Sequence, residues 1–545
     1  MRILSLIVLL CLATVCIAQE HGSAPAGSEV SFEQALAALT QKSFAKKAAA
    51  LVQIEAAAHP RALPVLRALA DGALYQRKDD QRVIIVSGTS ASPQLTDALT
   101  GETLPEVDTK AISKLPINNA MRGQLRMAIA RKSLGSADPD IRLSAVLDLS
   151  KAMSTESAEL LRPLLKNEVD DEVRKAAATA VALIDSASPN VVVRLAAVTA
   201  LGESVQPEAR ARLSQLLEAR DDMGYVERED AVRVAAAAAL RQIDGQLQLY
   251  AVAETVFFGL SLGSVLLLAA IGLAITFGVM GVINMAHGEL MMLGAYTTYV
   301  VQLLMPSHID ASLFVAVPAA FLVAGLVGIA IERGVIRFLY GRPLETLLAT
   351  FGVSLVLQQL VRSIFSPLNR SVETPSWMSG SIEINGALSL TLNRLYIIVF
   401  ALLVFAALLM LLKKTVFGLQ VRAVAQNRQM AQAMGIRSRW IDSLTFGLGS
   451  GIAGVAGVAL SQLTNVGPNL GQSYIIDSFM VVVFGGVGNL WGMLVGAFSL
   501  GVVNKFMEPW TGAVLAKILV LVFIILFIQK RPRGLFPQKG RAAEA

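Results

Sequence analysis

The second half of the chain consists of long apolar runs, whereas the first half alternates apolar and polar positions with a helical period. After residue 250 the runs reach roughly 18–25 residues, the length that a helix needs to cross about 30 Å of hydrocarbon. We predict nine spans: Ala251–Val279, Leu290–Met305, Ser312–Ile331, Leu344–Val361, Leu395–Leu412, Trp440–Leu463, Ile475–Val487, Trp491–Phe506 and Thr511–Ile528. Ile475–Val487 and Trp491–Phe506 are short and rich in glycine, so a re-entrant pair that leaves seven spans is the alternative.

The first residues have the features of a secretory signal. Arg2 precedes an apolar stretch, Ile3–Ile17, that is too short to span a membrane comfortably, and Ala18 ends it as a small residue at a cleavage position. An uncleaved anchor is the alternative. Both cysteines, Cys11 and Cys16, lie in this segment, so the mature chain would contain no disulfide, zinc–thiolate site or catalytic thiol.

Residues 19–249 are rich in alanine and predict an exported helical domain. Four segments share an apolar residue, an arginine and then a small residue three positions later: Ile141-Arg142 with Ala145, Val173-Arg174 with Ala177, Val193-Arg194 with Ala197, and Val232-Arg233 with Ala236. This pattern resembles HEAT-like repeats, in which stacked helix pairs bury a shared core. Gln81–Gly101 interrupts it and predicts a short hairpin or an insertion. His21 and His59 stand alone and are predicted to be surface residues.

The charges predict which ends of the spans face the cytoplasm. Residues 1–250 hold 28 Lys and Arg against 30 Asp and Glu, whereas residues 251–545 hold 19 against 11. The excess lies in alternate connections, 333–342 and 413–439, and in the tail from Lys530, so these face inside by the positive-inside rule. That orientation agrees with an exported first half. The basic balance therefore indicates membrane anchoring and not nucleic-acid binding.

We accordingly predict an all-α protein of the bacterial inner membrane, with about 7–9 spans after an exported HEAT-like domain. The predicted parts are a signal peptide (1–18), a periplasmic helical-repeat domain (19–249), a transmembrane domain (250–530) and a cytoplasmic tail (531–545).

Polar residues within the apolar half are candidates for a substrate pathway. Asn284, His287 and Glu289 lie within six residues, and a charged group at membrane depth costs on the order of 3 kcal/mol. The predicted topology places them at the cytoplasmic end of the first span, where that cost is smaller. Asp477 and Asn489 are two further candidates. Helix capping and hydrogen bonding between membrane helices are the alternative roles for all five.

The sequence contains no GxxxxGK[ST], HExxH or GxSxG motif, and we predict no catalytic residue, metal site or cofactor. Transport would therefore draw on an ion gradient or on an ATPase carried by another chain. Gly418–Trp440 reads as a basic amphipathic helix followed by a glycine, and it predicts a segment that docks into a groove of a partner. A helix lying on anionic lipid is the alternative.

Three segments in order resemble the branched-chain amino acid type permeases of ABC importers: GVINMAHGELMMLGAY, RAVAQNRQMAQAMGI and NVGPNLGQSYIIDSFMVVVFGGVGNLWGMLVGAF. The resemblance covers about residues 251–536. It implies a second homologous permease, two cytoplasmic ATPases and a periplasmic solute-binding protein. It also implies an ATPase-coupling segment that includes Arg422, Ala425, Asn427, Ala433, Gly435 and Ile436.

Within this family, Asn465–Trp491 and the long exported extension look most like the urea-transporting permeases, and we expect urea as the solute. A pathway for this small neutral molecule needs amide, hydroxyl or carboxylate groups. A permease for branched-chain amino acids or another small amide is the first alternative. A gradient-driven transporter or channel with an exported sensor domain is the alternative of another class.

Overall fold

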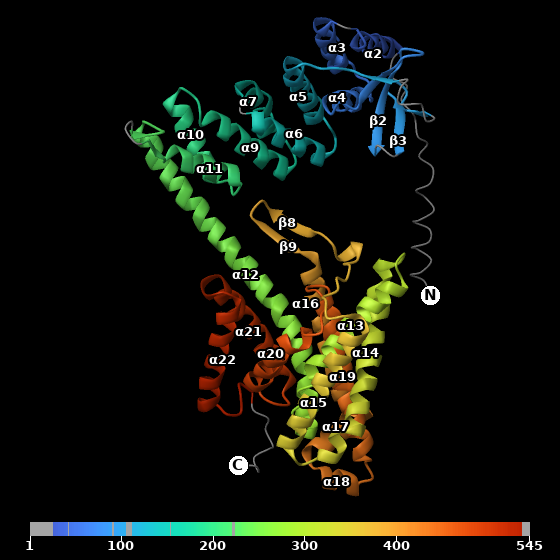
Figure 1. Cartoon of the computed structure of the whole chain (residues 1–545). Coiled ribbons are helices and arrows are strands. Elements are labelled where there is room, and N and C mark those ends of the chain that lie inside the picture. The colour runs from blue at the N-terminus through green and yellow to red at the C-terminus, as the bar shows by residue number, and fades with distance from the viewer. Residues whose placement is uncertain are drawn as a thin grey trace, which may run out of the picture. The chain divides into compact units, whose positions relative to one another are not determined.

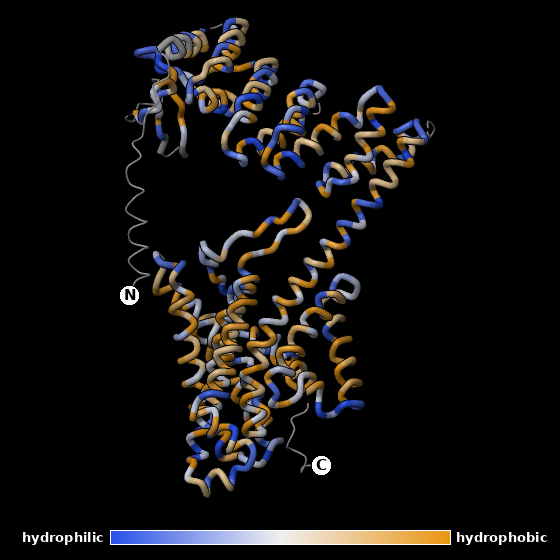
Figure 2. Tube along the Cα trace, turned by 180° about the vertical axis from the view of Figure 1, so that it is seen from behind, coloured by the Kyte–Doolittle hydropathy of each residue, from blue (hydrophilic) through white to orange (hydrophobic). Residues whose placement is uncertain are grey.

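The computed structural model describes residues 26–41, 43–89, 92–104, 112–152, 154–220 and 224–536. The chain divides into two compact units, Met1–Asp244 and Gly245–Ala545 (Figure 1). The predicted signal peptide, His21 and the tail beyond residue 536 lie outside the described residues. Helices of the second unit are mainly hydrophobic along their length, whereas those of the first unit mix hydrophobic and hydrophilic residues (Figure 2).

The first unit begins with a mixed subdomain. Its elements are α2 (Ala26–Leu39), α3 (Phe44–Ala56), α4 (Ala62–Ala70), β1 (Leu74–Arg77), β2 (Val83–Thr89), β3 (Ser92–Asp97), β4 (Thr103–Leu104) and β5 (Ile112–Lys114). The strands form an antiparallel sheet in the order β4-β3-β2-β1-β5. Its helices and strands share one hydrophobic core around Phe32, Ile54, Leu66 and Leu74.

The hairpin predicted within Gln81–Gly101 is confirmed, because β2 and β3 pair from Ile84–Asp97 to Thr89–Ser92. The all-α prediction is wrong for this subdomain, whose described residues form five strands. It is also wrong for two further hairpins, β6 (Ala219–Arg220) with β7 (Gly224–Tyr225) and β8 (Ser381–Asn385) with β9 (Leu388–Thr391). β1, β4 and β5 have two to four residues each, which is too short for an apolar–polar alternation to stand out in the sequence.

Helices then follow one another: α5 (Asn119–Leu134), α6 (Pro139–Ala152), α7 (Thr155–Leu161), α8 (Leu164–Asn167), α9 (Asp171–Asp185), α10 (Val191–Leu201) and α11 (Pro207–Leu216). A hairpin of β6 (Ala219–Arg220) and β7 (Gly224–Tyr225) leads to α12 (Asp230–Met280). Small residues of the repeated pattern are buried, among them Ala145, Ala177, Ala197 and Ala236. They allow neighbouring helices to pack closely, as the sequence predicted. The HEAT-like assignment itself remains a prediction.

The four patterned arginines mark the same place in four helices. Arg142, Arg174, Arg194 and Arg233 are each the fourth residue of α6, α9, α10 and α12. Each Nη1 donates to the carbonyl oxygen six residues earlier, at 2.8, 3.3, 2.9 and 3.0 Å respectively. The shared sequence pattern therefore places an arginine where it can hydrogen-bond the start of a helix to the loop before it.

The second unit contains nine long or apolar helices: α12, α13 (His287–Leu304), α14 (Ile309–Gly334), α15 (Pro343–Phe365), α16 (Leu392–Lys414), α19 (Ser438–Ser461), α20 (Leu470–Gly485), α21 (Leu490–Thr511) and α22 (Ala513–Lys530). Its shorter elements are η2 (Ile336–Leu339), η3 (Ser376–Met378), β8 (Ser381–Asn385), β9 (Leu388–Thr391), α17 (Val416–Gln426) and α18 (Arg428–Ala433). Each of the nine predicted spans corresponds to one of the nine helices.

Among the described residues, seven helices are long and apolar enough to cross a membrane, and α13 and α20 are not among them. The re-entrant alternative also left seven spans, but it did not count Trp491–Phe506 as a span. That segment lies in α21, which is one of the seven helices found here. The number of complete crossings therefore stays a prediction.

α19 lies at the centre of the bundle, with 89% of its most apolar window buried. Its glycines bring backbones together: a Cβ atom on Gly454 would lie 2.5 Å from the Ala320 carbonyl oxygen of α14.

Candidate functional site

His287, within the polar cluster Asn284–Glu289, lies beside the interior of α12 and not at its end. After Met280 the chain turns at Gly281, which has φ of +69°, and folds back along α12. His287 Nε2 donates to the Ala269 carbonyl oxygen at 2.9 Å. Ala269 precedes the end of α12 by eleven residues, or about 16 Å at 1.5 Å per residue. The expectation that these residues lie at the end of the first span is therefore wrong for His287.

All three candidate side chains are buried. Asn284 and His287 are 0% exposed and Glu289 is 1% exposed. Asn284 Oδ1 accepts from the Ala286 N–H at 3.0 Å, which fixes the turn before α13. Asn284 and His287 each use one polar side-chain atom in a hydrogen bond, whereas Asn284 Nδ2 and His287 Nδ1 are buried without a partner among the described residues. Their roles in a pathway remain a prediction.

Glu289 joins α13 to α15. Its Oε1 atom accepts from Gln358 Nε2 at 2.6 Å and from Ser354 Oγ at 3.1 Å. Its Oε2 atom is buried and has no hydrogen-bond partner within the described part of the chain. A carboxyl group offers about four lone-pair positions, so half of this group is unused.

Two further contacts, one before and one after Glu289 in the sequence, also join this part of the chain to α15. Thr350 Oγ1 accepts from the Met285 N–H at 3.1 Å, and the rings of Tyr296 and Phe365 lie 4.8 Å apart. From one contact to the next the residue numbers increase in both segments, so α13 and α15 run parallel. We call this line of contacts the α13–α15 seam; its members are Met285, Glu289, Tyr296, Thr350, Ser354, Gln358 and Phe365.

The seam residues of α15 were missed by the sequence analysis. Thr346, Thr350, Ser354 and Gln358 are spaced by four and all buried. Apolar residues of the same helix are exposed, among them Leu344, Leu348, Val356 and Leu360. A polar residue every four positions in an apolar span is a readable signal, because such residues lie on one face of a helix. The signal in α15 is weak, because each of these four polar residues is uncharged.

Asp477 forms an ion pair within the second unit. Its Oδ2 atom lies 2.9 Å from Lys517 Nζ, which joins α20 to α22. Lys517 also lies 5.8 Å from the centre of the Tyr474 ring. Asp477 is 6% exposed, so the cation offsets part of the cost of burying its charge. This contact favours a role in joining helices.

Asn489 is the N-cap of α21. Its Oδ1 atom accepts from the N–H groups of Trp491 and Gly492 at 3.1 and 3.2 Å, and its Nδ2 atom donates to the Phe536 carbonyl oxygen at 3.3 Å. Capping of this kind satisfies backbone donors that the first turn leaves open. Among the described residues, no hydrogen bond or ion pair joins Asp477 or Asn489 to a member of the α13–α15 seam.

The predicted coupling segment consists of two short helices. α17 ends at Gln426, and Asn427 caps α18 by accepting from the Met430 N–H at 2.9 Å. Gly435, with φ of +86°, turns the chain after α18. Arg422, Asn427, Ala433 and Gly435 are exposed, whereas Ala425 and Ile436 are partly buried. Exposed Met430 and Met434 add apolar surface beside them. The segment therefore presents a mixed surface of the kind that docks on a partner.

Arg428 holds this segment to the bundle. Its guanidinium pairs with Asp442 at the start of α19 and donates to the Tyr340 hydroxyl, over whose ring it lies at 4.0 Å. Burial raises the pKa of Tyr340, so the hydroxyl keeps its proton at neutral pH. Arg428 thereby connects α18 with α19 and with the turn before α15.

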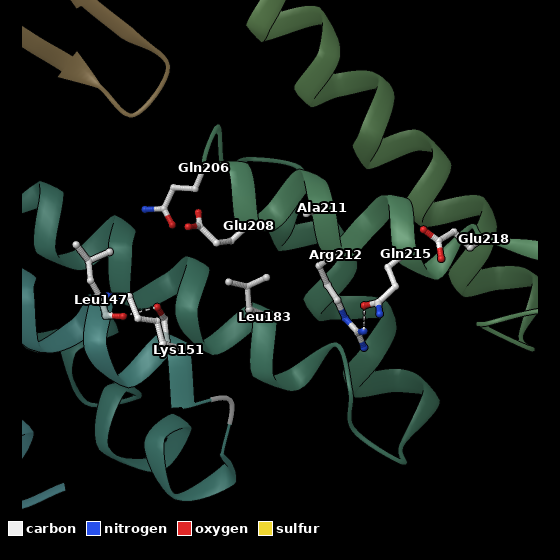
Figure 3. A pocket seen from close by; sticks show the side chains of 10 residues that line it. Leu147, Lys151, Leu183, Gln206, Glu208, Ala211, Arg212, Gln215 and Glu218 are labelled. Atoms are coloured by element: carbon white, nitrogen blue, oxygen red, sulfur yellow. Dashed lines mark hydrogen bonds between the residues drawn. The ribbon is translucent and has the colours of Figure 1, made fainter. Parts of the chain in front are cut away.

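The first unit contains a groove of about 660 Å³ on α6, α9 and α11 (Figure 3). Its lining residues are Leu147, Ser150, Lys151, Leu183, Gln206, Glu208, Ala211, Arg212, Gln215 and Glu218. Arg212 is held in place, because Nε donates to Ser186 Oγ at 2.8 Å and Nη1 donates to Gln215 Oε1 at 2.7 Å. Positively and negatively charged side chains both line the groove, so its charge does not indicate a particular class of ligand. Within the described residues, no group of three His, Cys, Asp or Glu side chains could hold a metal ion.

Comparison with known proteins places these features in a family context. The family described as "Branched-chain amino acid transport system / permease component" matches residues 255–528. The permease protein LivH of Salmonella typhimurium, from a high-affinity branched-chain amino acid transport system, is 32% identical over 293 residues, which are 52% of this chain and 94% of LivH.

The permease protein BraD of Pseudomonas aeruginosa, from a high-affinity system of the same description, is 30% identical over 297 residues, covering 53% of this chain and 96% of BraD. The ribose import permease protein RbsC of Bacillus subtilis is 32% identical over 110 residues, covering 19% of this chain and 34% of RbsC. Because LivH and BraD are matched over almost their whole length, neither has room for a counterpart of the first unit.

Proposed function

The chain belongs to the family of branched-chain amino acid transport permeases, and on that premise we propose that it carries an amino acid with an apolar side chain through the inner membrane as the permease subunit of an ABC importer. The match over nearly all of LivH is the observation that carries this proposal. Family membership makes the chain a transport subunit and not an enzyme. ATP hydrolysis then belongs to separate ATPase chains, and a binding protein delivers the solute.

Urea is not supported as the solute. That expectation rested on the exported extension and on Asn465–Trp491, and the relatives described here are named for branched-chain amino acids or for ribose. The alternative that the sequence left open, a permease for branched-chain amino acids, is the better supported one. An extension absent from LivH and BraD carries no information about the solute in the membrane.

We further propose a second homologous permease as the partner within the bilayer and the α17–α18 segment as the docking point for an ATPase. The exposed surface around Met430 and Met434 and the anchor at Arg428 support this assignment. The positive charge of connections 333–342 and 413–439 supports a cytoplasmic position for them, with residues 19–249 periplasmic. The first unit would then offer its groove to a periplasmic partner.

Uptake of radiolabelled leucine and urea by cells that carry the complete system tests the proposal. We expect uptake of leucine that requires ATP hydrolysis, and no uptake of urea. Uptake of urea without leucine would refute the proposed solute. Full transport by this chain alone in liposomes without ATP would refute the ABC assignment and favour a gradient-driven transporter or a channel.

A further inference from the structure

We infer that Glu289 binds the α-ammonium group of the transported amino acid, at a site that the α13–α15 seam forms with the start of α20. This inference rests on the proposed function and adds a recognition residue to it. Glu289 Oε2 is a buried oxygen without a partner in the described part of the chain, and the side chain is 1% exposed. Buried polar atoms are almost always hydrogen-bonded, so an unused carboxyl oxygen requires an explanation.

The protein partners of Glu289 are neutral. Gln358 and Ser354 donate one hydrogen bond each, both to Oε1, and no described cation forms an ion pair with Glu289. Elsewhere in this unit the buried Asp477 and Asp442 each have a basic partner, Lys517 and Arg428. A primary ammonium group has three donors and one positive charge, whereas the two groups hydrogen-bonded to Glu289 are neutral.

A guanidinium group lies one helical turn from Gln358 on α15. Arg362 Nη2 donates to the amide Asn469 Oδ1 at 2.7 Å, and the described residues show no ion pair for Arg362. Four residues of α-helix rise about 6 Å, so Gln358 and Arg362 are separated by a distance that one amino acid can bridge. A zwitterion would place its ammonium group toward Glu289 and its carboxylate toward Arg362. Urea, which is neutral, offers no charge to either group.

Glu289 lies where three helices converge. Gly288 and Gly471 are the second residues of α13 and α20, and a Cβ atom on Gly471 would lie 2.9 Å from the Glu289 backbone nitrogen. The start of α20 therefore lies against the start of α13, with α15 contacting Glu289 through its side chain. Tyr296, two turns along α13 from Glu289, has a second buried oxygen without a partner among the described residues. Glu289 and Tyr296 are seven residues apart, so these two atoms lie on one face of α13.

The alternative explanation is that Glu289 only joins α13 to α15 by hydrogen bonds. Glu289→Gln separates the two roles, because glutamine has the size of glutamate and can still accept from Ser354 and Gln358 through its oxygen, but carries no negative charge. Glu289→Asp keeps the charge on a shorter side chain. Glu332→Gln is a matched control, since Glu332 is also buried (3% exposed) and accepts from Ser443 on another helix.

The experiment measures leucine uptake into proteoliposomes that contain the complete importer, together with ATP hydrolysis and the melting temperature of each variant. We expect Glu289→Gln to lower the maximal rate of leucine uptake about tenfold or more, the scale of one lost hydrogen bond to a charged group. Its melting temperature should stay near that of the wild type. Glu289→Asp should recover part of the rate, and Glu332→Gln should transport nearly as the wild type does.

Wild-type leucine uptake by Glu289→Gln would overturn the inference. A loss of uptake that accompanies an equal loss of melting temperature in both Glu289→Gln and Glu332→Gln would assign Glu289 to helix packing and would also overturn it. These results differ from failure of the proposed function, in which the wild-type importer itself takes up no leucine.

Discussion

Replacement of Gly294 by alanine tests how closely α13 packs on α19. A Cβ atom at residue 294 would overlap the carbonyl oxygen of Gly454, and it would lie 2.5 Å from the carbonyl carbon and 2.6 Å from the Cα atom of that residue. The shorter distance is 0.9 Å below the 3.4 Å at which ordinary contact begins, and both groups are backbone that no rotamer change can move. Overpacking a dense interior costs about 1–3 kcal/mol, and we expect the upper end, about 3 kcal/mol. That is roughly a hundredfold change in the folded-to-unfolded ratio.

Thermal unfolding of the purified full chain, followed by the signal of its membrane unit, measures this cost. Gly352→Ala is the matched control, because Gly352 lies in the apolar helix α15 and a Cβ atom there meets nothing within 4 Å. We expect Gly294→Ala to lower the melting temperature by several degrees and Gly352→Ala to leave it nearly unchanged. Equal melting temperatures for the two variants would refute the close packing of α13 on α19.

Three further predictions concern charged groups. Hydrogen bonds from Arg142 and from backbone N–H groups hold the pKa of Glu168 below its usual value of 4.5, so this contact stabilises the fold fully above pH 4.5 and is lost as pH falls through the lower folded pKa. Melting curves of Glu168→Gln should therefore depend less on acidification below pH 4.5 than those of the wild type, and equal dependence would contradict this. A double-mutant cycle with Asp477→Asn and Lys517→Gln should give a coupling of about 1 kcal/mol, and additive losses would show that the pair contributes nothing. Arg428→Gln should reduce transport per ATP hydrolysed, measured in proteoliposomes, and an unchanged ratio would contradict its anchoring role.

The sequence predicted the membrane helices well because their signal is local. A helix in hydrocarbon must be apolar over its whole length, so each of the nine predicted spans corresponds to a helix from α12 to α22. The arginine pattern of the first unit was equally visible, since each of the four arginines contacts a carbonyl only six residues away. The short strands β1, β4 and β5 left no such trace, because pairing between distant segments forms them.

Only part of the candidate site could be predicted from the sequence. Glu289 attracted attention as a charge among apolar residues, and its burial agrees with that expectation. Its partners Ser354 and Gln358 lie 65 and 69 residues away along the chain, so only folding brings them to it. Asp477 and Asn489 had the same sequence signal as Glu289, yet the structure gives them a lysine and a helix N-terminus as partners.

Composition and periodicity alone determined that this chain has an apolar bundle of helices preceded by a unit rich in helices, and three motifs alone indicated its family. Only the tertiary structure decided that His287 lies beside the interior of α12, because the backbone turns at Gly281 and brings His287 back to Ala269. Only the tertiary structure also decided which buried carboxyl group has an unused oxygen. The physical reason is that hydropathy belongs to each residue separately, whereas the satisfaction of a polar atom depends on every group that folding brings within about 3 Å of it.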